Sequence, residues 1–348
     1  MTDLATSQGP STASPVAVLG AGAWGTALAL CLAERGESVR LWTWEPSHAA
    51  ELEAERENRR FFPGFPLHER IEPSADLRHT LADAKFALIV VPTPAVREVL
   101  ERAKPDLSPA TFLFVASKGI ETGSLLLLTE VVESVIGESA RSRSVVLSGP
   151  SFAQEVARGL PTSLVAAASN PSAAARAQEW IATERLRIYT SDDPVGVQVG
   201  GALKNVIAIA AGAVDGLNFG HNTRAALITR GLAEIARLGA AKGGHPLTLS
   251  GLAGLGDLVL TCSADLSRNR TVGLELGRGR TLDDVLVSLG HVAEGVTTAK
   301  SAYFLAQQLG VELPITNTVY RVIYENQPVA DAVRALLARP PRKERDSA

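Results

Sequence analysis

The chain has 348 residues, of which 46% are hydrophobic and 20% charged, and its formal net charge is −3. This balance is typical of a soluble globular chain of two domains, and it excludes the strongly basic or acidic segments with which proteins bind nucleic acid or a membrane surface. The cysteines, Cys31 and Cys262, form no CxxC pair and the six histidines show neither HxH nor HExxH spacing, so we expect a reducing, cytoplasmic compartment, no disulfide framework and no metal site.

Both ends of the chain have the composition of disordered tails. Residues 1–14 are polar and rich in Ser and Thr, and they lack the apolar stretch of a signal peptide and the arginines of a transit peptide. Residues 339–348, which read RPPRKERDSA, are interpreted in the same way.

From residue 15 to residue 191, short apolar runs rich in β-branched residues alternate with helical stretches. The predicted strands are 16–20, 38–44, 86–91, 111–116, 144–148, 162–167 and 186–190. Strands that alternate with helices predict an α/β domain with a doubly wound, mainly parallel sheet.

The first predicted strand leads directly into a GxGxxG motif, which opens a helix. The motif consists of Gly20, Gly22 and Gly25, with Ala23 and Trp24 between the last two glycines. Gly20 permits a tight turn, Gly22 lets the backbone approach a pyrophosphate, and Gly25 lets the helix pack against the strand. A glycine-rich turn without a ligand is the alternative, but the position between a strand and a helix favours a Rossmann-type, dinucleotide-binding domain.

Three charged residues bear on the choice of dinucleotide. Glu45 follows the second strand about 20 residues beyond the motif, where an acid usually holds the ribose 2′-hydroxyl of NAD. Arg59 and Arg60 are close enough in sequence to fold over this site, and an arginine there would accommodate the 2′-phosphate of NADP. All three side chains could equally lie in solvent, so the sequence leaves NAD and NADP open.

Polar residues also follow the fourth and fifth predicted strands, at the edge where open α/β sheets bind ligands. Lys118 follows the fourth strand, and Gly149 and Ser151 follow the fifth. Lysines at a sheet edge are often only solvated. Ser151 and Gln154 have the spacing of a capping box, which predicts a helix N-terminus with N–H groups that can also serve a ligand.

After Ser191 the composition shifts to Ala, Leu and Gly at helical spacing, so we expect residues 192–338 to form an all-α domain. Within residues 199–214 the only strongly polar side chains are Lys204 and Asn205. This apolar run is too short to span a bilayer and carries a charge near its middle, which predicts a buried core helix. Burial lowers the pKa of a lysine and makes Lys204 a candidate general acid or base, unless it extends its ammonium into solvent.

Two segments of the helical half contain candidate partners for this lysine. Residues 251–257, GLAGLGD, are predicted to form a tight loop, and Asp257 at its end is either a turn residue or a group that orients Lys204. Ser267, Arg268, Asn269 and Arg270 offer two guanidinium groups, a hydroxyl and an amide, which suit a phosphate. A charged surface loop is the alternative for this SRNR sequence.

Eight segments together resemble, in order, the bacterial NAD(P)-dependent glycerol-3-phosphate dehydrogenases. They read GAGAWGTALA, NRRFFPG, ASKGIE, SGPSFAQEV, GGALKNVIAIAAG, GLAGLGDLVLTC, SRNRTVG and VAEGV. The resemblance runs from residue 15 to about residue 335. It implies a dinucleotide-binding domain at 15–191 and a helical substrate domain at 192–338. It also implies NAD or NADP as cofactor, a homodimer, and reversible reduction of dihydroxyacetone phosphate to sn-glycerol 3-phosphate for glycerophospholipid synthesis.

The resemblance also implies roles for single residues. Lys204 corresponds to the proton donor and acceptor. The substrate contacts correspond to Lys118, Gly149, Ser151, Lys204, Asp257, Ser267, Arg268 and Asn269. The cofactor contacts, besides the glycine motif, correspond to Trp24, Lys118, Ala153, Arg268, Val292 and Glu294. Trp44 replaces a common arginine or histidine and Phe61 a common tyrosine, both on the adenosine side of the cofactor, which puts a preference for NADP in doubt.

Two other functions remain open from the sequence. A 3-hydroxyacid dehydrogenase would have a similar two-domain layout, but its carboxylate substrate gives less reason for the arginines of SRNR. A non-catalytic NAD(P) sensor would keep the fold without the chemistry, and the cost of burying Lys204 argues against it.

Overall fold

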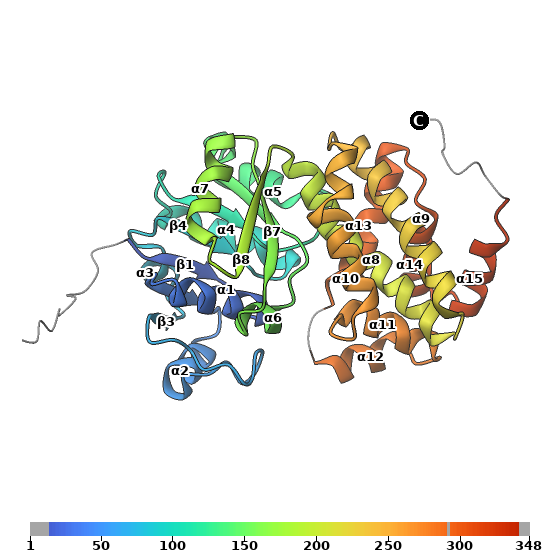
Figure 1. Cartoon of the computed structure of the whole chain (residues 1–348), viewed down its shortest axis with the longest axis horizontal. Helices are drawn as coiled ribbons and strands as arrows, with labels where there is room; N and C mark the ends of the chain where they lie inside the picture. The colour runs from blue at the N-terminus through green and yellow to red at the C-terminus, as the bar shows by residue number, and fades with distance from the viewer. Residues whose placement is uncertain (1–13, 291–292, 341–348) are drawn as a thin grey trace, which may run out of the picture.

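The computed structural model describes residues 14–290 and 293–340, which form a sheet-containing part and a helical part side by side (Figure 1). The tails predicted at 1–14 and 339–348 lie outside the described residues, except for Ser14, Arg339 and Pro340. The prediction of an α/β domain followed by an all-α domain is confirmed.

Eight strands form one sheet in the order β3-β2-β1-β4-β5-β6-β7-β8. Their bounds are β1 Val16–Leu19, β2 Val39–Trp42, β3 Ile71–Ser74, β4 Phe86–Ile89, β5 Phe112–Val115, β6 Ser144–Ser148, β7 Thr162–Ala167 and β8 Leu186–Ser191. Neighbouring strands are parallel except for β6 and β7, which are antiparallel. The prediction is wrong in omitting β3, whose sequence IEPS has no apolar run. This strand forms the edge of the sheet, where a proline is tolerated.

Helices cover both faces of the sheet. They are α1 Ala23–Glu34, α2 Pro46–Glu55, α3 Leu77–Leu81, α4 Val96–Ala103, α5 Leu128–Ile136, α6 Ala153–Ala157 and α7 Pro171–Ile181. Successive strand residues point to opposite faces of the sheet, so each strand contributes side chains to two hydrophobic cores. Val18 packs in a cluster that contains Leu28 of α1, whereas Leu19 packs in a cluster that contains Leu100 of α4. Burial on both faces explains the continuous apolar runs from which the strands were predicted.

The helical part is built around α8. Its helices are α8 Pro194–Gly216, α9 Gly220–Ala241, α10 Asp257–Ser263, α11 Arg268–Gly277, α12 Leu282–Leu289, α13 Glu294–Leu309, α14 Pro314–Tyr324 and α15 Val329–Leu337. With 23 residues, α8 is long and apolar enough to cross a bilayer, so the expectation that this run is too short is wrong. The helix is nevertheless a core helix, because 94% of its apolar window is buried inside the protein.

Helix α11 crosses α8 at very short range because glycines lie at the contact. A Cβ on Gly212 of α8 would lie 2.0 Å from the carbonyl oxygen of Arg270, and a Cβ on Gly273 of α11 would lie 1.8 Å from that of Ile209. Side chains at these two positions would force the helices apart. The crossing therefore fixes the start of α11 beside the middle of α8.

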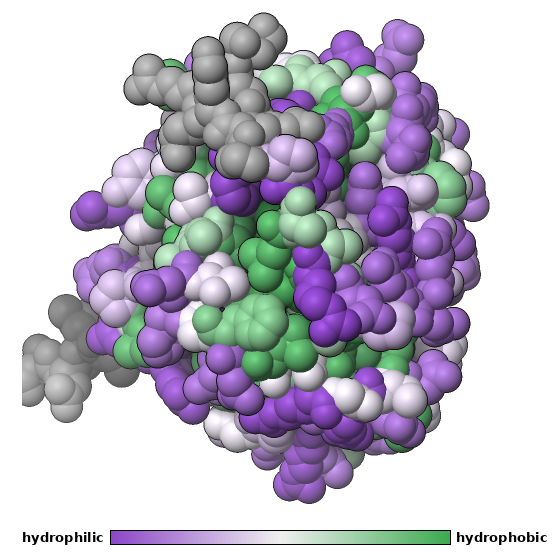
Figure 2. Space-filling model, turned by 90° about the vertical axis from the view of Figure 1, so that its right-hand side faces the viewer, coloured by the Kyte–Doolittle hydropathy of each residue, from purple (hydrophilic) through white to green (hydrophobic). Residues whose placement is uncertain are grey.

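The face of the helical part that points away from the sheet is hollowed. A cavity of about 470 Å³ lies between α8, α9, α14 and α15 and is lined largely by apolar side chains such as Leu227, Ile315 and Val333. Figure 2, which views the molecule from this side, shows apolar side chains around a depression with charged ones at its border.

Candidate active site

A second cavity, of about 510 Å³, lies where the carboxyl ends of β1, β2, β4 and β5 face the helical part. It brings together most of the predicted site residues. Those that line it are Gly20, Gly22, Ala23, Trp24, Lys118, Ser151, Lys204, Arg268, Asn269 and Glu294. Those that do not line it themselves are Gly25, Gly149, Ala153, Asp257 and Ser267. Val292 lies outside the described residues.

The glycine motif forms the turn from β1 into α1 at one end of this cavity. Gly20 has a φ of +123°, and a Cβ there would lie 2.8 Å from the carbonyl oxygen of Val90. A Cβ on Gly25 would lie 1.9 Å from the carbonyl oxygen of Gly20, so Gly25 serves the packing of helix on strand. A Cβ on Gly22 would meet no atom within 4 Å, which leaves its backbone open to a ligand.

Asp257 forms ion pairs with two lysines from different parts of the fold. Lys204 Nζ on α8 lies 2.6 Å from Asp257 Oδ1 and 3.0 Å from Thr261 Oγ1. Lys118 Nζ, in the loop after β5, lies 2.7 Å from Asp257 Oδ2 and 3.1 Å from the carbonyl oxygen of Gly149. Asp257 is thus the partner that orients Lys204, and Lys118 is a second cation that the sequence did not connect with it.

Burial and these charges shift two pKa values in the cluster. Burial is the largest effect on Lys204 and, with a smaller contribution from Lys118, lowers its pKa to about 8 against the opposing attraction of Asp257. Burial alone would raise the pKa of Asp257, but the two lysines outweigh it and hold that pKa below its usual value. The snorkelling alternative is wrong for Lys204, because the residue is only 7% exposed.

The glycine-rich segment before Asp257 positions this carboxylate. It forms a turn of π-helix over Leu252–Gly256 that continues into α10, and not the predicted loop. A Cβ on Gly254 would lie 2.1 Å from the carbonyl oxygen of Leu249, and a Cβ on Gly200 of α8 would lie 2.6 Å from that of Ala253. The glycines therefore let this segment pack directly on α8, one turn from Lys204.

Only one arginine of SRNR faces the cavity. Ser267 is the N-cap of α11, and its Oγ accepts a hydrogen bond from the Arg270 amide at 3.2 Å. Arg268 lines the cavity. The Asn269 amide nitrogen donates to Asn205 Oδ1 at 2.9 Å, and its oxygen accepts from the Gly295 amide at 2.9 Å. Asn269 therefore holds the start of α11 against both α8 and α13.

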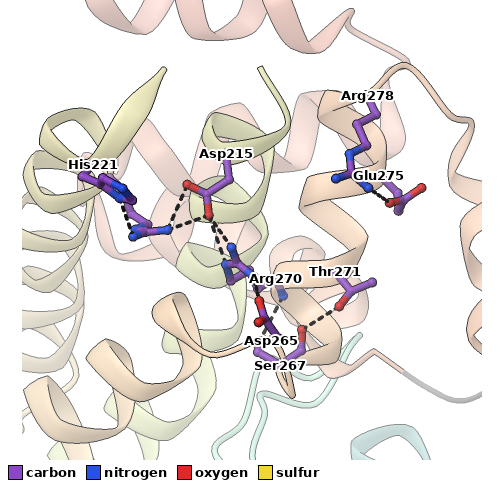
Figure 3. A network of polar contacts seen from close by, with 9 residues as sticks. Asp215, His221, Asp265, Ser267, Arg270, Thr271, Glu275 and Arg278 are labelled. Atoms are coloured by element: carbon purple, nitrogen blue, oxygen red, sulfur yellow. Dashed lines mark hydrogen bonds and ion pairs between the residues drawn. The ribbon is translucent and has the colours of Figure 1, made fainter. Parts of the chain in front are cut away.

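The other arginine, Arg270, belongs to a structural network (Figure 3). Its Nε and one terminal nitrogen lie 3.1 and 2.8 Å from Asp215 Oδ2, and its other terminal nitrogen lies 2.8 Å from Asp265 Oδ1. Asp215, near the end of α8, also pairs with Arg224 at 3.0 Å. The local SRNR pattern did not distinguish the two arginines, because their contacts depend on the direction in which each side chain points from α11. Only the family resemblance gave a role to Arg268 and none to Arg270.

The predicted capping box at Ser151 and Gln154 is wrong. Helix α6 has only five residues, its N-cap is Phe152, and no side chain caps it. Ser151 Oγ donates instead to the carbonyl oxygen of Gly149 at 3.0 Å. Gly149 has a φ of +139°, so the turn there requires glycine, and Ala153 packs against the sheet core beside α1.

Glu294, the first residue of α13, connects the helical part with the loop after β4. Its Oε1 accepts a hydrogen bond from the Thr93 amide at 3.2 Å. Burial raises the pKa of Glu294, and the hydrogen bond from Thr93 and the charge of Arg268 oppose that shift only in part. Sequence reasoning missed Thr93, although its place just after a strand at the ligand edge was a usable signal.

Unpartnered buried polar atoms show that this cavity fits a polar ligand of the dinucleotide type. Trp24 Nε1 and Glu294 Oε2 are buried, have no hydrogen-bond partner among the described residues, and belong to cavity-lining side chains. Buried polar groups normally find partners. A buried donor next to the glycine motif and a buried acceptor on Glu294 suit a nucleotide with an amide-bearing ring, and the lysines paired with Asp257 suit proton transfer.

The chain matches family models and known proteins over nearly its whole length. Residues 15–174 match the model described as NAD-dependent glycerol-3-phosphate dehydrogenase N-terminus, and residues 193–334 match the model of its C-terminus. Glycerol-3-phosphate dehydrogenase (NAD(P)+) of Geobacter metallireducens is 50% identical over 330 residues, which cover 95% of this chain and 98% of that protein. Its counterpart in Myxococcus xanthus is 50% identical over 94% of this chain and 98% of that protein. The crystal structure of glycerol-3-phosphate dehydrogenase from Coxiella burnetii has a TM-score of 0.90 at 44% identity, covering 94% of this chain and 99% of that one.

Proposed function

The chain belongs to the NAD-dependent glycerol-3-phosphate dehydrogenase family, and we propose how its residues divide the work of reducing dihydroxyacetone phosphate to sn-glycerol 3-phosphate with NAD(P)H. The observation that carries this assignment is the buried Lys204–Asp257–Lys118 cluster, at a cavity whose other end is a GxGxxG turn. When bound, NADH or NADPH supplies the hydride for the carbonyl carbon.

Lys204 is the proton donor for reduction and the proton acceptor for oxidation. As negative charge develops on the carbonyl oxygen, the Lys204 ammonium donates a proton to it. A pKa of about 8 leaves the amine able to exist in either form near neutral pH. When Lys204 is neutral, Asp257 retains Lys118 as a cationic partner, so the buried carboxylate never stands alone.

Arg268 binds the phosphate of the substrate, with Asn269 and Ser267 shaping its position. The guanidinium offers the several donors that a phosphate accepts, and Arg268 lines the cavity with Lys204. Asn269 uses one side-chain N–H for Asn205 and keeps a second for a ligand. Lys118, Gly149 and Ser151 complete the substrate side.

On the cofactor side, the glycine motif holds the pyrophosphate at the start of α1. Trp24 and Glu294 supply the unpartnered donor and acceptor described above. The roles of Ala153 and Val292 rest on the family resemblance alone.

One assay distinguishes the proposed reaction from the two alternatives, a 3-hydroxyacid dehydrogenase and a non-catalytic NAD(P) sensor. The purified chain should consume NADH or NADPH, followed by absorbance at the nicotinamide band, with dihydroxyacetone phosphate but not with 3-oxoacids or without substrate. A preference for 3-oxoacids would indicate the hydroxyacid dehydrogenase alternative. Tight cofactor binding with no turnover on any of these would indicate the sensor.

The oligomeric state, the cellular location and the division into domains are part of the same proposal. A homodimer is supported by the family resemblance and by the exposed apolar hollow of the helical part, since large apolar areas mark interaction sites. A cytoplasmic location is supported by the free thiols of Cys31 and Cys262 and by the burial of α8. The proposed domains are 15–191 and 192–338, and this division is supported by the end of β8 at Ser191 and the start of α8 at Pro194.

A further inference from the structure

The cavity that contains the glycine motif is also lined by an ion pair between Arg60 and Glu45. Arg60 NH1 lies 2.6 Å from Glu45 Oε2, and both residues line the cavity. The Arg60 guanidinium also lies over the ring of Phe61, 4.8 Å from its centroid. The adjacent Arg59 turns elsewhere and pairs with Glu55 and Glu57 at 3.3 and 3.5 Å.

The position of Glu45 follows from the sheet order. Strand β2 lies beside β1 and ends at Trp42, and Glu45 is the N-cap of α2 directly after it. Its carboxylate therefore stands beside the glycine motif, at the edge where doubly wound sheets bind the adenosine ribose. A free carboxylate at this place accepts ribose hydroxyls and repels a 2′-phosphate.

Arg60 is attached to the same turn through Asn58. Asn58 is fully buried, and its amide nitrogen donates to the carbonyl oxygen of Ala21 and to Thr26 Oγ1, both at 2.8 Å. Its oxygen lies 3.2 Å from His48 Nε2. These bonds anchor the segment that carries Arg60 to the glycine motif itself, while the Arg60 side chain remains 48% exposed and free to change rotamer.

We propose that Arg60 is the residue that lets this chain use NADPH, by moving from Glu45 to the 2′-phosphate. With NADH, Arg60 stays on Glu45, whose carboxylate accepts the ribose hydroxyl. Exposed ion pairs are weak, so a phosphate dianion can displace the carboxylate from the guanidinium at little cost. The inference rests on the coenzyme use proposed above and assigns its selectivity to the Glu45–Arg60 pair.

Calorimetric titration with adenosine 2′,5′-bisphosphate and with 5′-AMP isolates the contribution of the 2′-phosphate without any turnover. Arg60→Ala should weaken binding of the bisphosphate by about tenfold to a hundredfold and leave 5′-AMP within about twofold, as expected for one lost charged hydrogen-bonding group. Glu45→Gln should tighten the bisphosphate, because the competing carboxylate is gone. Arg59→Ala, the matched control, should change neither.

The same ratios should appear in kcat/KM for NADPH against NADH. Equal weakening of both probes by Arg60→Ala would make Arg60 a merely structural residue, and no weakening of the bisphosphate would remove it from the site. An unchanged probe ratio in Glu45→Gln would show that Glu45 does not compete. If the probe ratios shift as expected but dihydroxyacetone phosphate is not reduced, the proposed reaction fails and the coenzyme assignment stands.

Discussion

Lys204 Nζ lies 2.6 Å from Asp257 Oδ1, and the residue is only 7% exposed. Lys204→Ala should lower kcat by a factor on the order of 10² to 10⁴, the usual contribution of a general acid. The dissociation constant of NADH, measured by fluorescence titration, should change little. Lys242→Ala, which removes a lysine paired with Glu130 outside the site, should retain activity. Near-normal turnover in Lys204→Ala would take this residue out of the mechanism.

The pKa of about 8 for Lys204 lies below the usual lysine value of 10.5, so the amine loses its proton as pH rises through about 8. Reduction needs the protonated form and should slow across this range, while oxidation of glycerol 3-phosphate should accelerate. Asp257→Asn removes the charge that opposes the lowering, so both pH midpoints should move to lower pH. Opposite or absent movement of the midpoints would contradict the assigned pairing.

At the scale of single residues, the sequence identified candidate site residues but could not show which of them contact one another. Lys204 was recognisable because charged residues are rare in apolar helices. Its partner Asp257 is 53 positions away, and Lys118 is 139 positions from Asp257. No local pattern encodes such distances. Short-range patterns also misled, since Ser151 bonds to the carbonyl oxygen of Gly149 in place of the predicted cap.

At the scale of elements, the substrate side depends on how α11 is held against α8. Arg270 makes one of the connections, through Asp215 (Figure 3), and neither residue lines the cavity. Arg270→Ala should raise KM for dihydroxyacetone phosphate by about tenfold, because Arg268 at the start of the same helix loses its fixed position. The dissociation constant of NADH should change less than KM.

The matched control for this change is Arg278→Ala. Arg278 pairs with Glu275 at 2.7 Å near the other end of α11, and its side chain is 59% exposed. Exposed pairs contribute little, so KM and thermal stability should stay near those of the unmodified chain. A similar rise of KM in both variants would mean that general loosening of α11, and not the Asp215 connection, controls substrate binding.

Elements were predictable where burial leaves a periodic signal and unpredictable where it does not. Strands β1, β4 and β5 are buried on both faces and appear as apolar runs, whereas β3 sits at the edge and appears as IEPS. The SRNR sequence lacks apolar periodicity, which predicts a loop with a phosphate-type donor set, yet it opens α11. The glycines that allow α11 to approach α8 were not recognisable as a contact before both helices were placed.

At the scale of the whole molecule, the proposed homodimer predicts twice the monomer mass in solution, measurable by light scattering coupled to size exclusion. Leu337 is 65% exposed and borders the apolar hollow of the helical part. Leu337→Glu should shift the equilibrium toward monomer if this hollow is the contact between copies. A dimer that resists this change would place the contact on another face, and a monomer at all concentrations would rule out the dimer.

The two parts of the fold meet at the site and also at contacts outside it, such as the Lys242–Glu130 ion pair. Lys118 on the sheet side pairs with Asp257 on the helical side, and the Thr93 amide donates to Glu294. The order of the two domains was predictable from the change in composition after Ser191. Their mutual placement was not, because it depends on contacts between residues that are far apart along the chain.

The Lys204–Asp257–Lys118 cluster has a consequence for charge balance. Two ammonium groups against one carboxylate leave this cluster with a net charge of one positive unit, in a molecule whose formal net charge is −3. Arg268 and Glu294, which also line the cavity, have opposite charges. A phosphate ester carries about −1.5 to −2 charges at neutral pH, so the substrate brings negative charge that can balance the excess positive charge of this cluster. An uncharged triose would leave this positive charge uncompensated. The charge of the pocket, as well as its shape, therefore favours a phosphorylated ketone over an uncharged one.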